Sequence, residues 1–181
     1  VNAFSVGYAG MSITKDITVG LSVPFETAEQ LKIQFGSALE EKVEPTDMIS
    51  IPGIGGRDAR SVERRFLSQI MEPRIEEIFI MCKDGLLETD LLGKLTAGIV
   101  LTGGTSMTDG IVHLAESIFD LPVRTGAPHL PGDAPDIATS PRFATAIGAV
   151  LAASERRHRT DVIERKHPLW TKIRKWFIKK V

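Results

Sequence analysis

Segments with apolar residues at helical spacing alternate along this chain with short apolar runs, which predicts helices and short strands in succession. Residues 3–6 form a brief apolar run before a glycine-containing turn at 7–10, a pattern typical of a strand. Ser12 then suits the N-cap of a helix, and residues 27–35 predict a second helix that ends at Gly36. The apolar stripes of these two helices are Ile13, Ile17 and Leu21, and Ala28, Leu31 and Phe35.

The following segment predicts a strand at 48–51, a loop at 52–57 and a long helix at 61–81. Pro73 lies inside that helix. We expect it to kink the helix or divide it in two, because the proline ring removes a backbone donor and clashes with the preceding turn.

Residues 98–107 (GIVLTGGTSM) predict half of a β-turn-α unit. The run 99–101 is continuously apolar, which is typical of a strand covered on both faces in a parallel sheet. A turn at Gly103 and Gly104 ends it, and a helix follows with apolar positions at Ile111, Leu114, Ala115 and Ile118. The remaining predicted elements are a strand at 123–124, a Pro/Gly-rich loop at 128–141 and a small-residue helix at 143–153.

The glycine turn is a candidate ligand loop, because Gly103 and Gly104 let the backbone come close to a bound group. Paired glycines often serve only to make a turn, so this signal is weak alone. On the preceding helix Glu29 and Lys32 share a face, where a carboxylate and an ammonium could hold a ribose and its base edge. A solvated surface ion pair is the ordinary alternative.

The last fifteen residues, 167–181 (HPLWTKIRKWFIKKV), predict an amphipathic helix that lies on an anionic membrane. Leu169 to Val181 spans roughly 20 Å as helix, too short for a hydrocarbon core of about 30 Å. The alternative is a terminal helix that docks on the folded body. The apolar and aromatic residues are Leu169, Trp170, Ile173, Trp176 and Phe177, and the basic ones are Lys172, Arg174, Lys175, Lys179 and Lys180.

Residues 154–166 are nearly all polar and predict a flexible linker before this helix. Burial of the apolar face and the cost of ordering the peptide nearly cancel, so a single tail should bind weakly. Firm attachment would then need several tails, held together by self-association.

Composition fits an ordinary globular chain, with 43% apolar and 25% charged residues among 181. Its charge is divided: ten basic and three acidic residues follow from Glu155 onward, against twelve basic and twenty acidic before it. An acidic body argues against nucleic acid as the main partner. Cys82 is the only cysteine, which points to a reducing compartment, and the four histidines show no metal-ligand spacing. The start at Val1 rather than Met suggests a fragment or a processed product.

Five motifs in order give the chain a family resemblance over nearly its whole length: GMSITKDITVGL, AEQLKIQFGSA, ISIPGIGGR, EPRIEEIF and GIVLTGGTSM. With the amphipathic terminus, they resemble the carboxy-terminal half of the FtsA family, the actin-like division proteins of bacteria. The resemblance implies a partial actin/Hsp70-like (ribonuclease H-like) α/β fold. Residues 1–46 and 98–153 would form part of subdomain 2A with the adenosine-side loop, and 47–97 would form subdomain 2B, which binds FtsZ.

By the same resemblance the cofactor is ATP, with phosphate and magnesium held by residues that precede residue 1. Glu29 and Lys32 would contact the adenosine, and Gly103, Gly104, Thr105 and Met107 would form the adenine-side loop. No catalytic residue and no metal ligand is assigned. The family has weak or no ATP turnover, and we expect this chain alone to be inactive.

The resemblance also implies a scaffold that tethers FtsZ filaments to the cytoplasmic face of the inner membrane at the division site. Arg74 matches the arginine that helps to hold the acidic FtsZ tail. Further partners would be copies of itself, anionic lipids and later division proteins. Two alternatives share the fold: the half of a phosphotransferase such as a sugar kinase, and an actin-like pilus or shape protein. A soluble kinase has no use for a basic, Trp-rich terminal helix.

Overall fold

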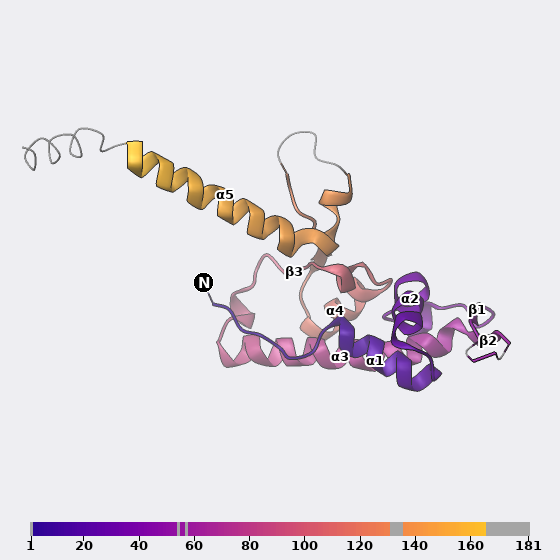
Figure 1. Cartoon of the computed structure of the whole chain (residues 1–181). Helices are drawn as coiled ribbons and strands as arrows, with labels where there is room; N and C mark the ends of the chain where they lie inside the picture. The colour runs from indigo at the N-terminus through magenta and orange to yellow at the C-terminus, as the bar shows by residue number, and fades with distance from the viewer. Residues whose placement is uncertain (1, 54, 57, 131–135, 166–181) are drawn as a thin grey trace, which may run out of the picture.

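The structure is a computed structural model, and it describes residues 2–53, 55–56, 58–130 and 136–165. Its helices and strands are, in chain order, α1 (Gly10–Leu21), α2 (Phe25–Phe35), β1 (Met48–Ile51), β2 (Arg60–Glu63), α3 (Arg64–Glu88), β3 (Ile99–Leu101), α4 (Ile111–Phe119), β4 (Val123–Thr125) and α5 (Ala144–Arg165) (Figure 1). Short 3₁₀ turns lie between them: η1 (Glu40–Lys42), η2 (Leu92–Lys94), η3 (Gly104–Met107), η4 (Asp136–Thr139) and η5 (Pro141–Phe143).

The first two helices form where the apolar stripes predict them. Ile13 and Ile17 are completely buried, and Leu21 is nearly so. The α1 helix ends at Ser22, which adopts a left-handed conformation and donates its N–H to the last turn. The α2 helix ends at Gly36, whose N–H donates to the Lys32 carbonyl. Ser12 is not the N-cap, because the helix already begins at Gly10.

The long helix α3 is the centre of the fold, and it packs against both α1 and α4 (Figure 1). Leu67 and Met71 are fully buried on one half of it, and Ile75 and Phe79 are buried on the other. Of the two expected effects of Pro73, a kink or a division, the division is wrong, since α3 passes through Pro73 as one helix. Both halves bury their apolar face in the same core, and this burial outweighs the lost backbone bond.

Two strand predictions need correction at the edges of these helices. Residues 60–63 form β2, which pairs antiparallel with β1, so α3 begins at Arg64 and not at residue 61. Ile49 lies opposite Val62 in this hairpin, and both face the core. Residues 3–6 form no strand, and in the described ranges no strand pairs with them. Their neighbour is α3, where the Phe4 ring lies against Gly85.

Strands β3 and β4 pair in parallel, with α4 as the crossover between them, as the β-turn-α pattern predicts. Ile99 and Leu101 pack on the core, but Val100 is 48% exposed. The expectation of cover on both faces is therefore wrong for the described residues. Successive side chains point to opposite faces, and the apolar core lies on only one of them.

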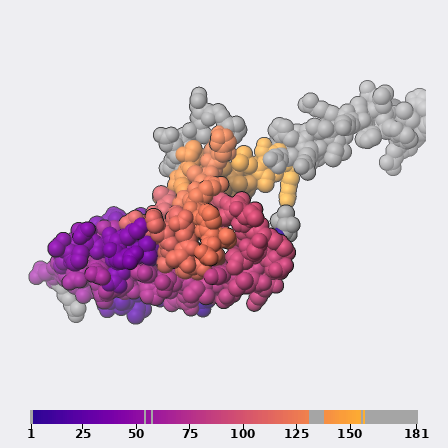
Figure 2. Space-filling model, turned by 180° about the vertical axis from the view of Figure 1, so that it is seen from behind, coloured from indigo at the N-terminus to yellow at the C-terminus, as the bar shows by residue number. Residues whose placement is uncertain are grey.

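The helix α5 projects away from the rest of the described chain (Figure 1). In the space-filling view from behind, the coloured first part of α5 lies above the body of the chain (Figure 2). It continues to Arg165 and so includes most of the predicted linker as helix. Val150 is 69% exposed on it. None of the helices in the described part of the chain has the length and apolar character needed to span a bilayer. The predicted membrane helix, 167–181, lies outside the described residues.

One apolar cluster runs through the whole body. It includes Ile49 and Leu67 from the predicted subdomain 47–97 together with Ile13 and Leu114 from the predicted 2A portion. The assignment of these segments to two subdomains stays a prediction. The apolar core is continuous across the predicted boundaries at residues 46/47 and 97/98.

Close packing at the end of α2 gives a stability prediction. A Cβ at Gly36 would lie 2.4 Å from the Lys32 carbonyl oxygen and 2.7 Å from the Met71 Cε. We expect Gly36→Ala to lower the free energy of unfolding by about 1–3 kcal/mol, because backbone must move to admit the methyl group. Urea denaturation measures this change. Gly93→Ala is the control, since a Cβ there meets no atom within 4 Å; equal stability of the two variants would refute the close approach.

Candidate functional site

A cavity of about 600 Å³ opens between the start of α1, one face of α2, and the turns η3 and η5. Its size suits a small organic ligand. Six residues are predicted from the sequence to contact adenosine, and this cavity brings five of them together. They are Glu29, Lys32, Gly104, Thr105 and Met107.

Lys32 ties the α2 wall of the cavity to α1. Its ammonium donates to the Gly10 carbonyl at 3.0 Å, to Thr14 Oγ1 at 2.7 Å and to Glu29 Oε2 at 2.6 Å. These bonds use all three N–H donors of the side chain, which is only 11% exposed. Lys32 therefore acts first on the protein itself, where it fixes α1 against α2.

Glu29 keeps one carboxylate oxygen for a ligand. Its Oε2 accepts from Lys32 and from the buried Thr14 hydroxyl, while within the described chain no hydrogen bond reaches Oε1. Burial raises the pKa of Glu29, but the hydrogen bonds from Lys32 and Thr14 outweigh it, so the pKa lies below its ordinary value. An ionised oxygen at a cavity wall is suited to accept hydrogen bonds from sugar hydroxyl groups.

The opposite wall is the loop that follows β3. Gly103 does not line the cavity; it makes the turn with a φ of 94°, a conformation that glycine adopts without strain. Its N–H donates to the Pro141 carbonyl at 3.0 Å, and its carbonyl accepts from Ser106 Oγ at 2.8 Å. The loop is thus fixed before η3 begins, and the role of Gly103 in a nucleotide site stays a prediction.

The start of α1 touches this loop directly. A Cβ on Gly10 would lie 2.5 Å from Thr105 Oγ1, so only glycine allows the approach. Sequence reasoning missed Gly10 as a cavity residue, and it also missed Met11, Phe25 and Arg142, which line the same cavity. None of these positions carries a local signal, because each reaches the cavity only through tertiary packing.

These groups can bind a polar, flat ligand, and they do not form a catalytic constellation. The wall offers one free carboxylate oxygen, apolar side chains and the closely packed glycine loop. In the residues that the structure describes, no group of three or more His, Cys, Asp or Glu side chains could hold a metal ion.

Arg74, the predicted FtsZ contact, lies away from this cavity and is bound by carboxylates of its own chain. Its Nε and Nη2 donate to the two carboxylate oxygens of Asp16 at 2.5 and 3.2 Å, and its Nη1 donates to Glu77. Its guanidinium carbon also lies 5.7 Å from the centre of the Tyr8 ring. The hydrogen bond with Asp16 is the main reason that the pKa of Arg74 is raised.

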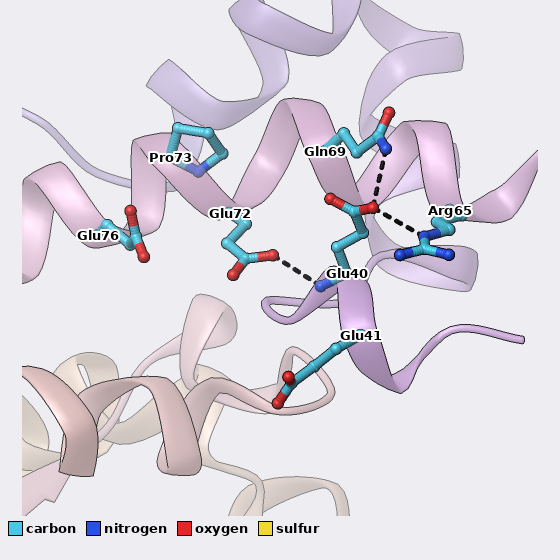
Figure 3. A pocket seen from close by; sticks show the side chains of 7 residues that line it. All are labelled: Glu40, Glu41, Arg65, Gln69, Glu72, Pro73 and Glu76. Atoms are coloured by element: carbon cyan, nitrogen blue, oxygen red, sulfur yellow. Dashed lines mark hydrogen bonds and ion pairs between the residues drawn. The ribbon is translucent and has the colours of Figure 1, made fainter.

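A second cavity, of about 380 Å³, lies between η1 and α3 on a surface where no site residue was predicted. Figure 3 shows Glu40 among the residues that line it, and its carboxylate accepts from Arg65 at 2.7 Å and from Gln69 at 2.9 Å. The Glu40 N–H in turn donates to Glu72 at 2.6 Å. These bonds attach η1 to α3, and the bond from Gln69 leads the causes that lower the pKa of Glu40.

Comparison with known proteins identifies the family of this chain. The family model described as "Cell division protein FtsA" matches residues 1–148. Proteins of that name are 46% identical over 145 residues in Neisseria meningitidis serogroup B, 36% over 143 residues in Pseudomonas aeruginosa and 32% over 157 residues in Escherichia coli K12. These matches cover 80%, 79% and 83% of this chain, but only 35%, 34% and 37% of the relatives. The chain thus spans about a third of their length.

Solved structures support the fold. MreB5 of Spiroplasma citri, bound to AMPPNP, superposes with a TM-score of 0.67 at 18% identity and covers 86% of this chain and 46% of its own. The same protein bound to ADP gives a TM-score of 0.63. The predicted α/β actin-like fold, present in part, is therefore confirmed for the body of the chain.

The Glu29 carboxylate provides a pH-dependent test of the α2 wall. We expect Lys32→Met to raise the pKa of Glu29, because the ammonium no longer offsets burial. The folded-state pKa lies below the unfolded value of about 4.3, so the carboxylate stabilises the fold above that pH, and this contribution is lost as pH falls through the folded pKa. Carbon NMR titration of Glu29 measures the shift. Lys15→Met, an exposed lysine on α1, is the control, and an unchanged Glu29 in Lys32→Met would contradict the network.

Proposed function

This chain belongs to the FtsA family of cell division proteins, and on that basis we propose that it is part of an ATP-binding scaffold that ties FtsZ filaments to the cytoplasmic membrane. The scaffold would lie on the inner face of the membrane at the division site as a peripheral protein. One observation supports nucleotide binding: a single cavity brings together five of the six residues predicted from the sequence to contact adenosine.

The adenosine half of ATP would enter this cavity. Glu29 Oε1 would accept hydrogen bonds from the ribose, and Gly104, Thr105 and Met107 would contact the base. MreB5, which shares the fold, is described as bound to AMPPNP and to ADP, and this supports a nucleotide in the equivalent region. Phosphate and magnesium would be held by residues outside this chain, so no step of phosphate chemistry is assigned to its side chains.

A binding role is favoured over phosphoryl transfer. The Glu29 carboxylate is stabilised as an anion by Lys32 and Thr14, and its lowered pKa makes it a poor base. A pilus or shape protein remains the alternative within the same fold, and the family match argues against it.

Arg74 is the proposed anchor for the acidic FtsZ tail. Asp16 already binds it through two oxygens, which supports its capacity to hold a carboxylate in that geometry. A partner would have to replace Asp16 or Glu77, so we expect the affinity to depend on these two competitors.

The membrane part of the proposal rests on residues 167–181, whose Trp, Phe and Lys side chains suit the headgroup region. We expect one tail to bind reversibly and a filament of many copies to bind firmly. Self-association and contacts with later division proteins are proposed from family membership.

The tail can be tested with vesicles of anionic lipid. We expect Trp176→Glu combined with Phe177→Glu to abolish sedimentation of the chain with these vesicles. Each apolar side chain contributes about 1.5 kcal/mol or more, so the affinity should fall roughly a hundredfold. The control changes Val150 and Leu151, two exposed apolar residues of α5, to Glu. Equal sedimentation of the tail variant and the unchanged chain would defeat the anchor.

The partner site can be tested with a labelled peptide of the acidic FtsZ tail by fluorescence anisotropy. We expect Arg74→Glu to weaken binding about tenfold or more, because a charge-assisted bond becomes a repulsion. Asp16→Asn should strengthen binding, since it weakens an internal competitor.

Arg124→Glu, the same change of charge at an exposed position on β4, should leave the affinity unchanged. If Arg74→Glu binds the peptide as well as this control does, Arg74 is not part of the site.

A further inference from the structure

Arg142 lies on the wall of the nucleotide cavity, although no motif singles it out. It belongs to the short turn η5, which follows the Pro/Gly-rich loop. Its side chain is exposed, and it lines the same cavity as Gly104 and Met107. A Cβ on Gly104 would lie 4.0 Å from the Arg142 Cβ, so the two backbones are direct neighbours.

Two contacts fix η5 against the glycine loop. The Pro141 carbonyl accepts from the Gly103 N–H at 3.0 Å, and Ser140 Oγ donates to Met107 Sδ at 3.6 Å. Within η5, the Phe143 N–H donates to the Ser140 carbonyl at 3.1 Å. The backbone of Arg142 is therefore held in place relative to the predicted adenine-side loop.

The guanidinium of Arg142 makes no ion pair with any residue that the structure describes. Its central carbon lies 5.5 Å from the centre of the Phe143 ring, a cation–π distance. By contrast, Arg64, Arg65 and Arg74 all bind carboxylates of the chain. An arginine at a cavity without an internal carboxylate keeps its donors and one planar face for another partner.

We propose that Arg142 is a base-binding residue of the nucleotide site, where its guanidinium stacks on the purine ring. This rests on the proposed function, because it takes the cavity to hold a nucleoside. With the ribose at Glu29 on the α2 wall, the base lies toward the loop wall, between Met107 and Arg142. A guanidinium is planar and weakly hydrated, so it stacks well on flat π-systems such as a purine.

Stacking by Arg142 predicts a specific base preference that differs from the preference expected if Arg142 contacted the base edge. A guanidinium that read the base edge would favour guanine, whose O6 and N7 accept two hydrogen bonds from arginine. A stacked guanidinium contacts the π-face, which every purine has, and so contributes similarly to adenine and guanine. Loss of Arg142 should therefore weaken adenosine and guanosine by the same factor.

The test is titration of the complete 181-residue chain with adenosine and with guanosine, followed by proton–nitrogen NMR. These nucleosides carry base and ribose alone, so no phosphate site is required. We expect Arg142→Ala to raise both dissociation constants about fivefold. Arg142→Lys should recover little affinity, because an ammonium keeps the charge but has no planar face. Arg124→Ala, another exposed arginine, is the control and should bind as the unchanged chain does.

The variant Glu29→Gln tests the nucleoside site of the proposed function independently of Arg142. If Glu29→Gln weakens binding and Arg142→Ala does not, the nucleoside site stands and the role of Arg142 is overturned. If Arg142→Lys binds fully, or if only guanosine binding is lost, stacking is overturned. If the unchanged chain binds neither nucleoside, the nucleoside site in this chain and the role of Arg142 in it both fall. The stacking role is supported if Arg142→Ala weakens the binding of adenosine and guanosine equally, if Arg142→Lys binds both weakly as well, and if Arg124→Ala binds both normally.

Discussion

The burial of one face of α3 between α1 and α4 is the constraint on which the remaining structure depends. Leu67 and Met71 have no exposed surface, and Phe79 packs edge-on against Phe119 with ring centres 5.8 Å apart. Because a single helix contacts both neighbours, it fixes the α1–α2 pair relative to the β3–α4 unit. The cavity lies between those two groups, so its shape follows from the packing of a helix that contributes no residue to its wall.

Within that frame, one ammonium group determines the geometry of the α2 wall. Lys32 joins a backbone carbonyl and a hydroxyl of α1 to a carboxylate of α2, and its bonds to the hydroxyl and the carboxylate are short, at 2.7 and 2.6 Å. This contact and the hydrogen bond from Thr14 together outweigh burial and lower the pKa of Glu29. Lys32, which the family resemblance assigns to ligand contact, thus binds groups of the protein itself. Through these bonds it holds the Glu29 carboxylate at the cavity wall.

Local pattern was sufficient for the elements whose apolar side faces a single core. The stripe of α1, the end of α2 at Gly36 and the parallel pair β3–β4 around α4 all follow from the sequence. The errors arose where the outcome depends on distant segments: β2 needs β1 as its partner, the helix α3 survives Pro73 through tertiary burial, and Val100 lacks a second covering layer. Arg142 was missed for the same reason, since only the folded loop brings it to Gly104.

The helix α1 connects the proposed nucleotide site with the proposed partner site. Its first residue, Gly10, contacts the cavity and Lys32, while Asp16, further along the helix, binds Arg74. A shared helix couples two sites only if it has two positions, since a rigid element carries no change between them. Ile13 and Ile17 are completely buried on its inner face, which favours one position. The geometry therefore favours a rigid arrangement, in which the packing of α1 keeps the proposed nucleotide site and the proposed partner site at a constant separation.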